Sequence, residues 1–288
     1  MINSLLALQV DLFLMRLKVL LPTDFSTTSH NAIVYAFSMF KGLDVEVDLL
    51  HVIHDDGEDP VQLKEITSTA SHQFELLKDA LYKKGIEVPQ HISFNITHGT
   101  NISQIIDEYV FEHQNDLLIL GATGEISSSK HLLSERTIEL ISLTKIPVLS
   151  IPKNSAFKKI KDIIYATDLS DIDFEARELI AFARVFDATV HFVHVFPEML
   201  GTTRFKPEHI TNDLVKKFNY PKISFDAIMN NEVEKALVDF IVLKQPEIVA
   251  LFTHKRNIIE QLFYHSVTKE LSIRIDTPIF TFKKVEKI

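Results

Sequence analysis

The chain has 288 residues, a length that indicates about two domains of roughly 150 residues each. Its hydrophobic share of 46% and charged share of 24% are those of a folded globular protein, so a largely disordered chain is excluded. The formal charge of -9 offers no basic surface for nucleic acid, and the absence of cysteine excludes disulfides and thiolate chemistry. We therefore expect a cytoplasmic protein that binds no nucleic acid.

The first fifteen residues form an apolar segment with Asp11 in its interior and no Lys or Arg. The segment is too short to span a bilayer, and it lacks the basic start of a signal peptide. We predict an N-terminal extension at residues 1–15 that does not enter a membrane, with Met15 as an alternative start of translation.

The rest of the sequence repeats one pattern twice. Residues 17–27 (LKVLLPTDFST) match residues 161–171 (KDIIYATDLSD), and both segments end an apolar run with Thr-Asp-x-Ser. Three further segments recur in the same order: residues 47–55, 116–124 and 144–151 match residues 190–198, 247–255 and 275–282. An internal repeat of this length predicts two copies of one domain, at residues 16–152 and 158–288.

Short apolar runs alternate with helical patterns in the first copy. We expect strands at residues 17–22, 45–52, 91–97, 116–120 and 148–151, and helices at 27–41, 60–84, 101–113 and 135–143. Residues 116–120 and 247–251 are continuously apolar after their first residue, as in strands covered on both faces. Alternating strands and helices with right-handed crossovers predict an α/β fold with helices on both faces of a parallel sheet.

Ligands of open parallel sheets bind beyond the carboxyl ends of the strands. Asp24 follows the first strand, and Gly121 and Gly124 follow the fourth. A carboxylate suits a ribose hydroxyl or an adenine amine, and glycines admit a phosphate close to the backbone. Two local roles remain open, because Asp24 can stabilise the next helix start and the glycines can serve only a turn.

The turn at residues 22–26, the Leu-His-Val segment at 50–52, and Gly121 and Gly124 with Ser134 ten residues after Gly124 together resemble the universal stress protein family, as a tandem pair. The resemblance implies two Rossmann-like domains of the adenine nucleotide alpha hydrolase type, each with a five-stranded parallel sheet, and a role in stress responses. In the ATP-binding branch of the family the loop pattern is Gly-x2-Gly-x9-Gly-Ser/Thr. Carried over by position, the nucleoside contacts are Asp24 and Val52, and the phosphate loop is Gly121, Gly124, Ser134, Glu135 and Thr137.

Two departures weaken the implied phosphate site. Ser134 replaces the third glycine, and Glu135 replaces the hydroxyl residue. A carboxylate at a helix start satisfies exposed N–H groups and repels phosphate, so we predict a plugged site in the first copy. The second copy lacks both glycines, and its corresponding residues are Phe252, Lys255, His265, Ser266 and Thr268. Ordinary nucleotide binding is not expected there.

Lys255 and Arg256 precede a helix-like run in the second copy, where cations oppose the helix dipole unless an anion lies nearby. Two interpretations remain open: Arg256 pairs with Glu260, or the two cations bind a phosphate-like group together with Ser266 and Thr268.

The histidine pairs His51 with His54 and His191 with His194 lie three residues apart on predicted strands, which directs the members of each pair to opposite faces. Joint metal ligation is therefore not expected, and no known hydrolase motif is present in the sequence.

The leading hypothesis is a non-catalytic binding or regulatory module of the stress response, without a certain cofactor. The alternatives are a sensor that binds ATP or AMP in the first copy and hydrolyses ATP slowly, and a structural dimerisation unit. Residues 148–151 and 279–282 end the two copies with strand-forming sequence. By the same resemblance we expect these strands to pair the two domains within one chain, which can then form a homodimer.

Overall fold

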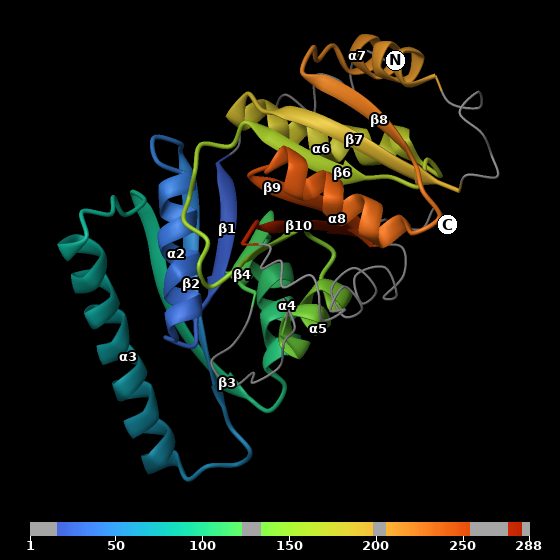
Figure 1. The fold of residues 1–288 in the computed structure, drawn as a ribbon. Coiled ribbons are helices and arrows are strands. Elements are labelled where there is room, and N and C mark those ends of the chain that lie inside the picture. Colours follow the sequence, from blue (N-terminus) through green and yellow to red (C-terminus); the bar gives the residue numbers. More distant parts are fainter. Residues whose placement is uncertain (1–15, 123–133, 198–205, 254–275, 284–288) are drawn as a thin grey trace, which may run out of the picture. The chain divides into compact units, whose positions relative to one another are not determined.

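A computed structural model describes residues 16–122, 134–197, 206–253 and 276–283 (Figure 1). The predicted extension at residues 1–15 lies outside the described residues. The chain divides into two compact units, Met1–Phe157 and Lys158–Ile288. No helix among the described residues is long and apolar enough to cross a membrane.

The first unit alternates strands and helices along the chain. Its elements are β1 (Leu17–Pro22), α2 (Thr27–Met39), β2 (Val45–His54), α3 (Pro60–Lys83), β3 (His91–Gly99), α4 (Ile102–His113), β4 (Leu117–Gly121), α5 (Glu135–Leu143) and β5 (Val148–Ile151). The strands lie in the order β3-β2-β1-β4-β5, and all neighbouring strands in this unit are parallel. Val19 of β1 lies opposite Val47 on one side and Leu117 on the other. These central strands are buried on both faces, as their continuous apolar sequence predicts.

Helices cover both faces of this sheet. The chain moves from β1 outward to β3 and then crosses back to β4, so right-handed crossovers place α2 and α3 on one face and α4 and α5 on the other (Figure 1). Local sequence sets the helix starts: Ser26 caps α2 through the N–H of Ser29, and Asn101 caps α4 through the N–H of Gln104. Both caps precede apolar positions that face the sheet, so local and tertiary signals agree.

The second unit has the same plan. Its elements are β6 (Asp162–Ala166), α6 (Ile172–Phe186), β7 (Thr189–Phe196), α7 (Pro207–Phe218), β8 (Ile223–Met229), α8 (Val233–Lys244), β9 (Ile248–Thr253) and β10 (Ile279–Lys283). The strand order is β10-β9-β6-β7-β8, again parallel throughout. One core cluster joins α8 to the sheet through Leu237 and Ile241, which pack with Ile164, Val193 and Val249.

In each unit, one carboxylate accepts a hydrogen bond from the backbone of the central strand. Asp116, just before β4, accepts a hydrogen bond from the N–H of Lys18 at 2.9 Å. Glu247, just before β9, accepts from the N–H of Asp162 at 2.9 Å. The predicted α/β class with a parallel sheet and flanking helices is confirmed.

Small differences from the predicted bounds have a tertiary cause. β2 and β3 each run two residues further than expected, because the two strands remain paired up to His54 and Gly99. The polar residues His54 and His98 conceal this extension in the sequence, since they interrupt the apolar pattern that marks a strand.

Candidate functional site

The turn after β1 carries Asp24, the predicted nucleoside contact. The Asp24 carboxylate accepts a hydrogen bond from the N–H of Ser26 at 3.1 Å, while Thr23 Oγ1 accepts from the N–H of Phe25 at 3.0 Å. Phe25 has a φ of 61°, so the turn passes through the left-handed region at a residue with a large side chain. The carboxylate therefore shapes the turn that precedes α2.

The second unit contains the same turn. Asp168 accepts from the N–H of Ser170 at 2.8 Å, and Leu169, which corresponds to Phe25, has a φ of 66°. In both units this Asp accepts the backbone N–H two residues further along the turn, and the N-cap of α2 is Ser26 and not Asp24. The Asp24 side chain is also exposed to solvent.

The electrostatics of Asp24 favour the charged form. Burial around the carboxylate raises its pKa, but hydrogen bonds from Ser26 and Ser29 outweigh this effect and leave the pKa below its ordinary value. An ionised, exposed carboxylate accepts hydrogen bonds from hydroxyl or amino groups.

Val52 lies near this turn in half-buried surroundings. The preceding His51 binds the turn directly, since its Nδ1 lies 2.8 Å from the carbonyl oxygen of Thr23 and must donate to it. The Phe25 ring packs on the His51 ring at a centroid distance of 4.6 Å. Val52 is thereby held at the carboxyl end of β2, beside the end of β1.

Gly121 ends β4, the strand that pairs with β1, so Asp24 and Gly121 lie at the same sheet edge. A Cβ at Gly121 would lie 2.6 Å from Thr28 Cγ2 and 3.1 Å from the Thr28 backbone. Glycine is therefore required here by the close approach of α2, whether or not a phosphate binds. Gly124 lies outside the described residues.

The start of α5 holds the other predicted phosphate contacts. Ser134 is the N-cap, and its Oγ accepts from the N–H of Thr137 at 3.1 Å. Thr137 is 1% exposed, and its hydroxyl donates to the Ala122 carbonyl oxygen at 3.2 Å. Glu135 is the first helical residue and is exposed. The N–H of Thr137 is thus taken by Ser134 and not by the Glu135 carboxylate that the sequence suggested, while both hydroxyls of this segment bind the protein itself.

The corresponding edge of the second unit contains aromatic rings. Phe252 is 5% exposed, stacks on Phe282 at 4.8 Å and meets the Tyr165 ring edge-on at 5.3 Å. Burial raises the pKa of Tyr165, and the nearby Glu175 carboxylate raises it further, so its phenol stays neutral. Lys255, Arg256, Ser266 and Thr268, which we considered as an anion site, lie outside the described residues.

The first unit also contains a cluster of buried polar side chains on β2, on β3 and just after α4. This cluster was not predicted from the sequence. Asp48 of β2 is 8% exposed and accepts from Ser93 Oγ at 2.5 Å and from Asn115 Nδ2 at 3.1 Å. Burial raises the pKa of Tyr109 on α4 to about 12, with a further contribution from the Asp48 charge. A carboxylate within the apolar run VDLLHV was the one available sequence signal for this cluster.

The second unit has a different polar row at the same register. His191 lies opposite Ser224, as Asp48 lies opposite Ser93. His191 Nδ1 is 2.7 Å from Ser224 Oγ, and its Nε2 is 2.8 Å from Asp162 Oδ1. Because a carboxylate only accepts, the proton of the bond to Asp162 lies on His191 Nε2, and Ser224 Oγ also donates to Asp226 Oδ2 at 3.4 Å. The three residues lie far apart in sequence, which hid the row from motif searches.

Three further histidines each bind a separate partner. His54 pairs with Asp56 and His98 with Asp55, while His194 repeats the bond of His51 by pointing Nδ1 at the Thr167 carbonyl oxygen, 2.9 Å away. Within the described ranges, no group of three or more acidic or histidine side chains is placed to hold a metal ion.

Comparison with known proteins identifies the first unit. Residues 15–152 match the model of the universal stress protein family. The universal stress protein MJ0577 of Methanocaldococcus jannaschii is 28% identical over 164 residues, which covers 48% of this chain and 96% of that protein.

Solved structures extend the likeness in fold. The crystal structure of a universal stress protein from Archaeoglobus fulgidus is 17% identical, with a TM-score of 0.67 over 93% of this chain and 97% of that chain. A universal stress protein solved in complex with cAMP is 17% identical, with a TM-score of 0.37 over 48% of this chain and 98% of that chain. The family match over residues 15–152 shows that the first unit is a universal stress protein domain of the UspA-like type.

Proposed function

We propose that this protein is a non-catalytic binding module of the stress response, acting in the cytoplasm, whose first unit has a weakened adenine nucleotide site. The second unit has no nucleotide site of the ordinary type. The observation that carries this proposal is the start of α5, where the Ser134 and Thr137 hydroxyls bind the protein and Glu135 adds a negative charge.

The nucleoside end of the proposed site is intact. Asp24 is exposed and ionised, and it lies at the same sheet edge as Gly121. Val52 supplies a half-buried apolar side chain at the end of the neighbouring strand. These groups suit the ribose hydroxyls and the base of an adenosine.

The phosphate end is impaired. A helix start attracts phosphate through its free N–H groups and its dipole. At α5 the Ser134 side chain already takes the N–H of Thr137, and the Glu135 carboxylate opposes an approaching anion. AMP or a nucleoside should therefore lose less affinity than ATP does.

Calorimetric titration with ATP and AMP tests the proposal. The wild type should bind ATP weakly or not at all, whereas Ser134→Gly combined with Glu135→Ser should gain affinity by roughly ten- to a hundredfold, as expected for about 1 to 3 kcal/mol. Loss of the serine cap for glycine costs only a few tenths of a kcal/mol, so α5 should still form.

The two copies provide a matched control. In the restored background Asp24→Ala should weaken binding, while Asp168→Ala, which changes the same turn in the second unit, should leave it unchanged. Tight ATP binding by the unmodified protein that persists in Gly124→Val would contradict both the impaired phosphate end and the position of the site.

The second candidate function is an ATP or AMP sensor that uses the first unit and hydrolyses ATP slowly. The exposed, ionised Asp24 favours it. Micromolar affinity of the wild type for ATP, with phosphate release that stops in Asp24→Ala, would support the sensor over the non-catalytic module.

A further inference from the structure

The side chain of His51, near the end of β2, holds the backbone of the turn that carries Asp24. The pairing of β1 with β2 ends at Pro22 and Leu50, so the carbonyl group of Thr23 lies one residue beyond the last paired position. His51 Nδ1 lies 2.8 Å from this carbonyl oxygen and donates to it. The N–H of Thr23 donates to the Leu50 carbonyl oxygen, also at 2.8 Å. Two adjacent residues of β2 therefore fix both polar backbone groups of Thr23.

The carbonyl group that His51 holds belongs to the same peptide group as the N–H of Asp24. A trans peptide group is planar, and its C=O and N–H point in opposite directions. The described residues contain no cis peptide bond. A donor that fixes the Thr23 carbonyl therefore also fixes the direction of the Asp24 N–H and the point from which the Asp24 side chain leaves the backbone.

This N–H in turn acts on the Asp24 carboxylate. Burial raises the pKa of the carboxyl group, but hydrogen bonds from Ser26, from Ser29 and from the N–H of Asp24 itself outweigh burial and leave the pKa below its ordinary value. Asp24 is exposed, so the ionised carboxylate can accept hydrogen bonds from a ligand. His51 thus reaches the carboxylate through one peptide group, without touching it.

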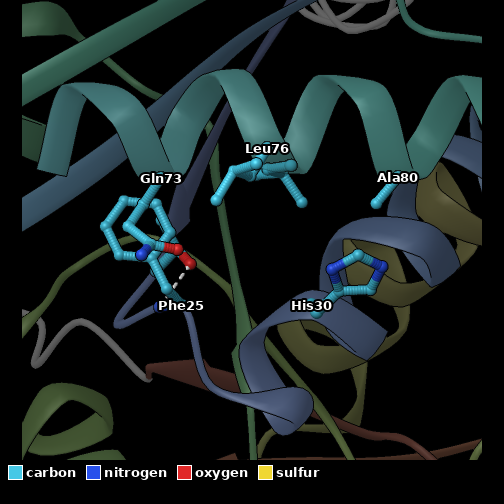
Figure 2. Close-up of a pocket in the computed structure, with 7 residues that line it drawn as sticks. Phe25, His30, Gln73, Leu76 and Ala80 are labelled. Carbon is cyan, nitrogen blue, oxygen red and sulfur yellow. Dashed lines mark hydrogen bonds between the residues drawn. The ribbon is translucent and has the colours of Figure 1, made fainter. Parts of the chain in front are cut away.

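His51 also packs against the turn, and this contact has to be separated from its hydrogen bond. The Phe25 ring lies on the His51 ring at a centroid distance of 4.6 Å and meets the Phe74 ring of α3 edge-on at 5.0 Å. Figure 2 shows Phe25 facing α3, where Phe25 and Gln73 line one pocket. The Phe25 ring therefore keeps a second support on α3 when the ring of His51 is removed.

The second unit repeats the arrangement. His194 Nδ1 lies 2.9 Å from the Thr167 carbonyl oxygen, and the N–H of Thr167 donates to the Val193 carbonyl oxygen at 2.9 Å. Asp168 follows Thr167 as Asp24 follows Thr23. The bond thus belongs to the turn in both units, and His194 provides a matched control in the unit for which no ordinary nucleotide site is proposed.

We propose that His51 is a positioning residue of the nucleotide site, whose Nδ1–H holds the peptide group between Thr23 and Asp24 and so directs the Asp24 carboxylate toward a nucleoside. The proposal rests on the proposed function, because it concerns the nucleoside end of the same site. It gives His51 no contact with the ligand.

Two variants of His51 separate its hydrogen bond from its ring. His51→Phe keeps a ring against Phe25 and loses the donor, whereas His51→Asn loses the ring and keeps an N–H donor two bonds from Cβ, as in histidine. Calorimetry with AMP compares them in the Ser134→Gly, Glu135→Ser background. His51→Phe should bind AMP about three- to tenfold more weakly, as expected for one lost hydrogen bond, while His51→Asn and the control His194→Phe should stay within about twofold of the background.

A measurement without ligand tests the same step in the otherwise unchanged chain. Carbon NMR of the Asp24 carboxyl group gives the midpoint of its titration. The midpoint should rise in His51→Phe, because the N–H of Asp24 is no longer held in place, and it should keep its wild-type value in His51→Asn and in His194→Phe.

Three results would overturn the proposal. Wild-type Asp24 titration in His51→Phe would show that the carboxylate does not depend on this bond. Losses in His51→Asn as large as those in His51→Phe would assign the effect to the ring, and equal losses in His194→Phe would show that the effect is not local to the turn. If the Ser134→Gly, Glu135→Ser background itself binds no AMP, the proposed nucleotide site fails, and the Asp24 titration still decides the role of His51.

Discussion

The ends of β4 and β9 occupy corresponding places in the two units, but they are packed differently: a helix approaches the first closely, and aromatic side chains surround the second. In the first unit α2 lies so close to β4 that Gly121 has no room for a Cβ beside Thr28. In the second unit Phe252 fills the edge with a ring that packs on Phe282 and Tyr165. The Asp turn is nevertheless the same in both units. An Asp in this turn is therefore part of the fold in both units, whereas the packing at the end of the fourth strand differs between them.

A second difference lies at the paired register of Asp48 with Ser93 and of His191 with Ser224. The serine is common to both units, while its partner changes from a carboxylate to an imidazole. The Asp48 carboxylate accepts hydrogen bonds from Ser93 and Asn115. The His191 imidazole is hydrogen-bonded to Asp162 in addition to its serine. The same serine should therefore matter more in the first unit.

The largest expected effect is that of Phe252→Ala. Truncating a buried phenyl ring leaves a cavity and should lower the free energy of unfolding of the second unit by about 3 to 5 kcal/mol. Urea unfolding followed by circular dichroism measures the loss, and hydrogen exchange should assign it to β6 and β9. Phe111→Ala, at a residue that is 84% exposed, should change stability by about 0.5 kcal/mol or less. Equal effects of the two variants would show that Phe252 is not a core residue.

Ser93→Ala and Ser224→Ala compare the two polar pairs. Ser93→Ala removes a hydrogen bond to a buried carboxylate and should cost about 1.5 to 3 kcal/mol. Ser224→Ala should cost about 1 kcal/mol or less, because His191 retains its bond to Asp162. The urea midpoints of the two variants decide between them, and a larger loss for Ser224→Ala would reverse the comparison.

Gly121→Ala tests the close approach of α2 to β4. The added methyl group should destabilise the first unit by about 1 to 3 kcal/mol, since it meets both the side chain and the backbone of Thr28. Thr28→Ser removes the Cγ2 atom that lies nearest, so the double variant should recover part of the loss in the same unfolding measurement. A neutral Gly121→Ala would mean that α2 can move away at no cost.

The smallest expected effect is a pH dependence. Burial, with a further contribution from Lys84, lowers the pKa of His30 below its ordinary 6.5, so the unfolded chain binds the proton more readily than the folded chain does. Stability should therefore fall as the pH drops below about 6.5. Phe174 occupies the corresponding place in the second unit, and His30→Phe copies it.

Free energies of unfolding at pH 7 and pH 5.5 measure this term. The loss on acidification should be smaller in His30→Phe than in the wild type, while His72→Phe, an exposed change on α3, should keep the wild-type slope. Identical slopes for the wild type and His30→Phe would show that His30 is solvated equally in both states.

Much of the fold could be read from the sequence because its signals are local. The apolar runs at residues 17–22 and 148–151 are strands with the predicted bounds, and α5 has the predicted bounds 135–143. Hydrophobic periodicity and caps such as Ser26 depend on neighbours along the chain, and the internal repeat then fixed the shared plan of the two units. The sequence also brought Asp24 and Gly121 to one sheet edge, since parallel strands end on the same side.

Only the tertiary structure decided what these residues do there. In the folded protein Thr28 packs so closely on Gly121 that only glycine fits there. Ser134 caps α5, and the Thr137 hydroxyl donates to the Ala122 carbonyl oxygen in the interior. It also brought His191 to Asp162 and Ser224, and left His30 Nε2 buried without a partner among the described residues. The physical reason is that burial, close approach and side-chain hydrogen bonds depend on elements that are distant in sequence. A sequence pattern does not say how far apart such elements lie in space.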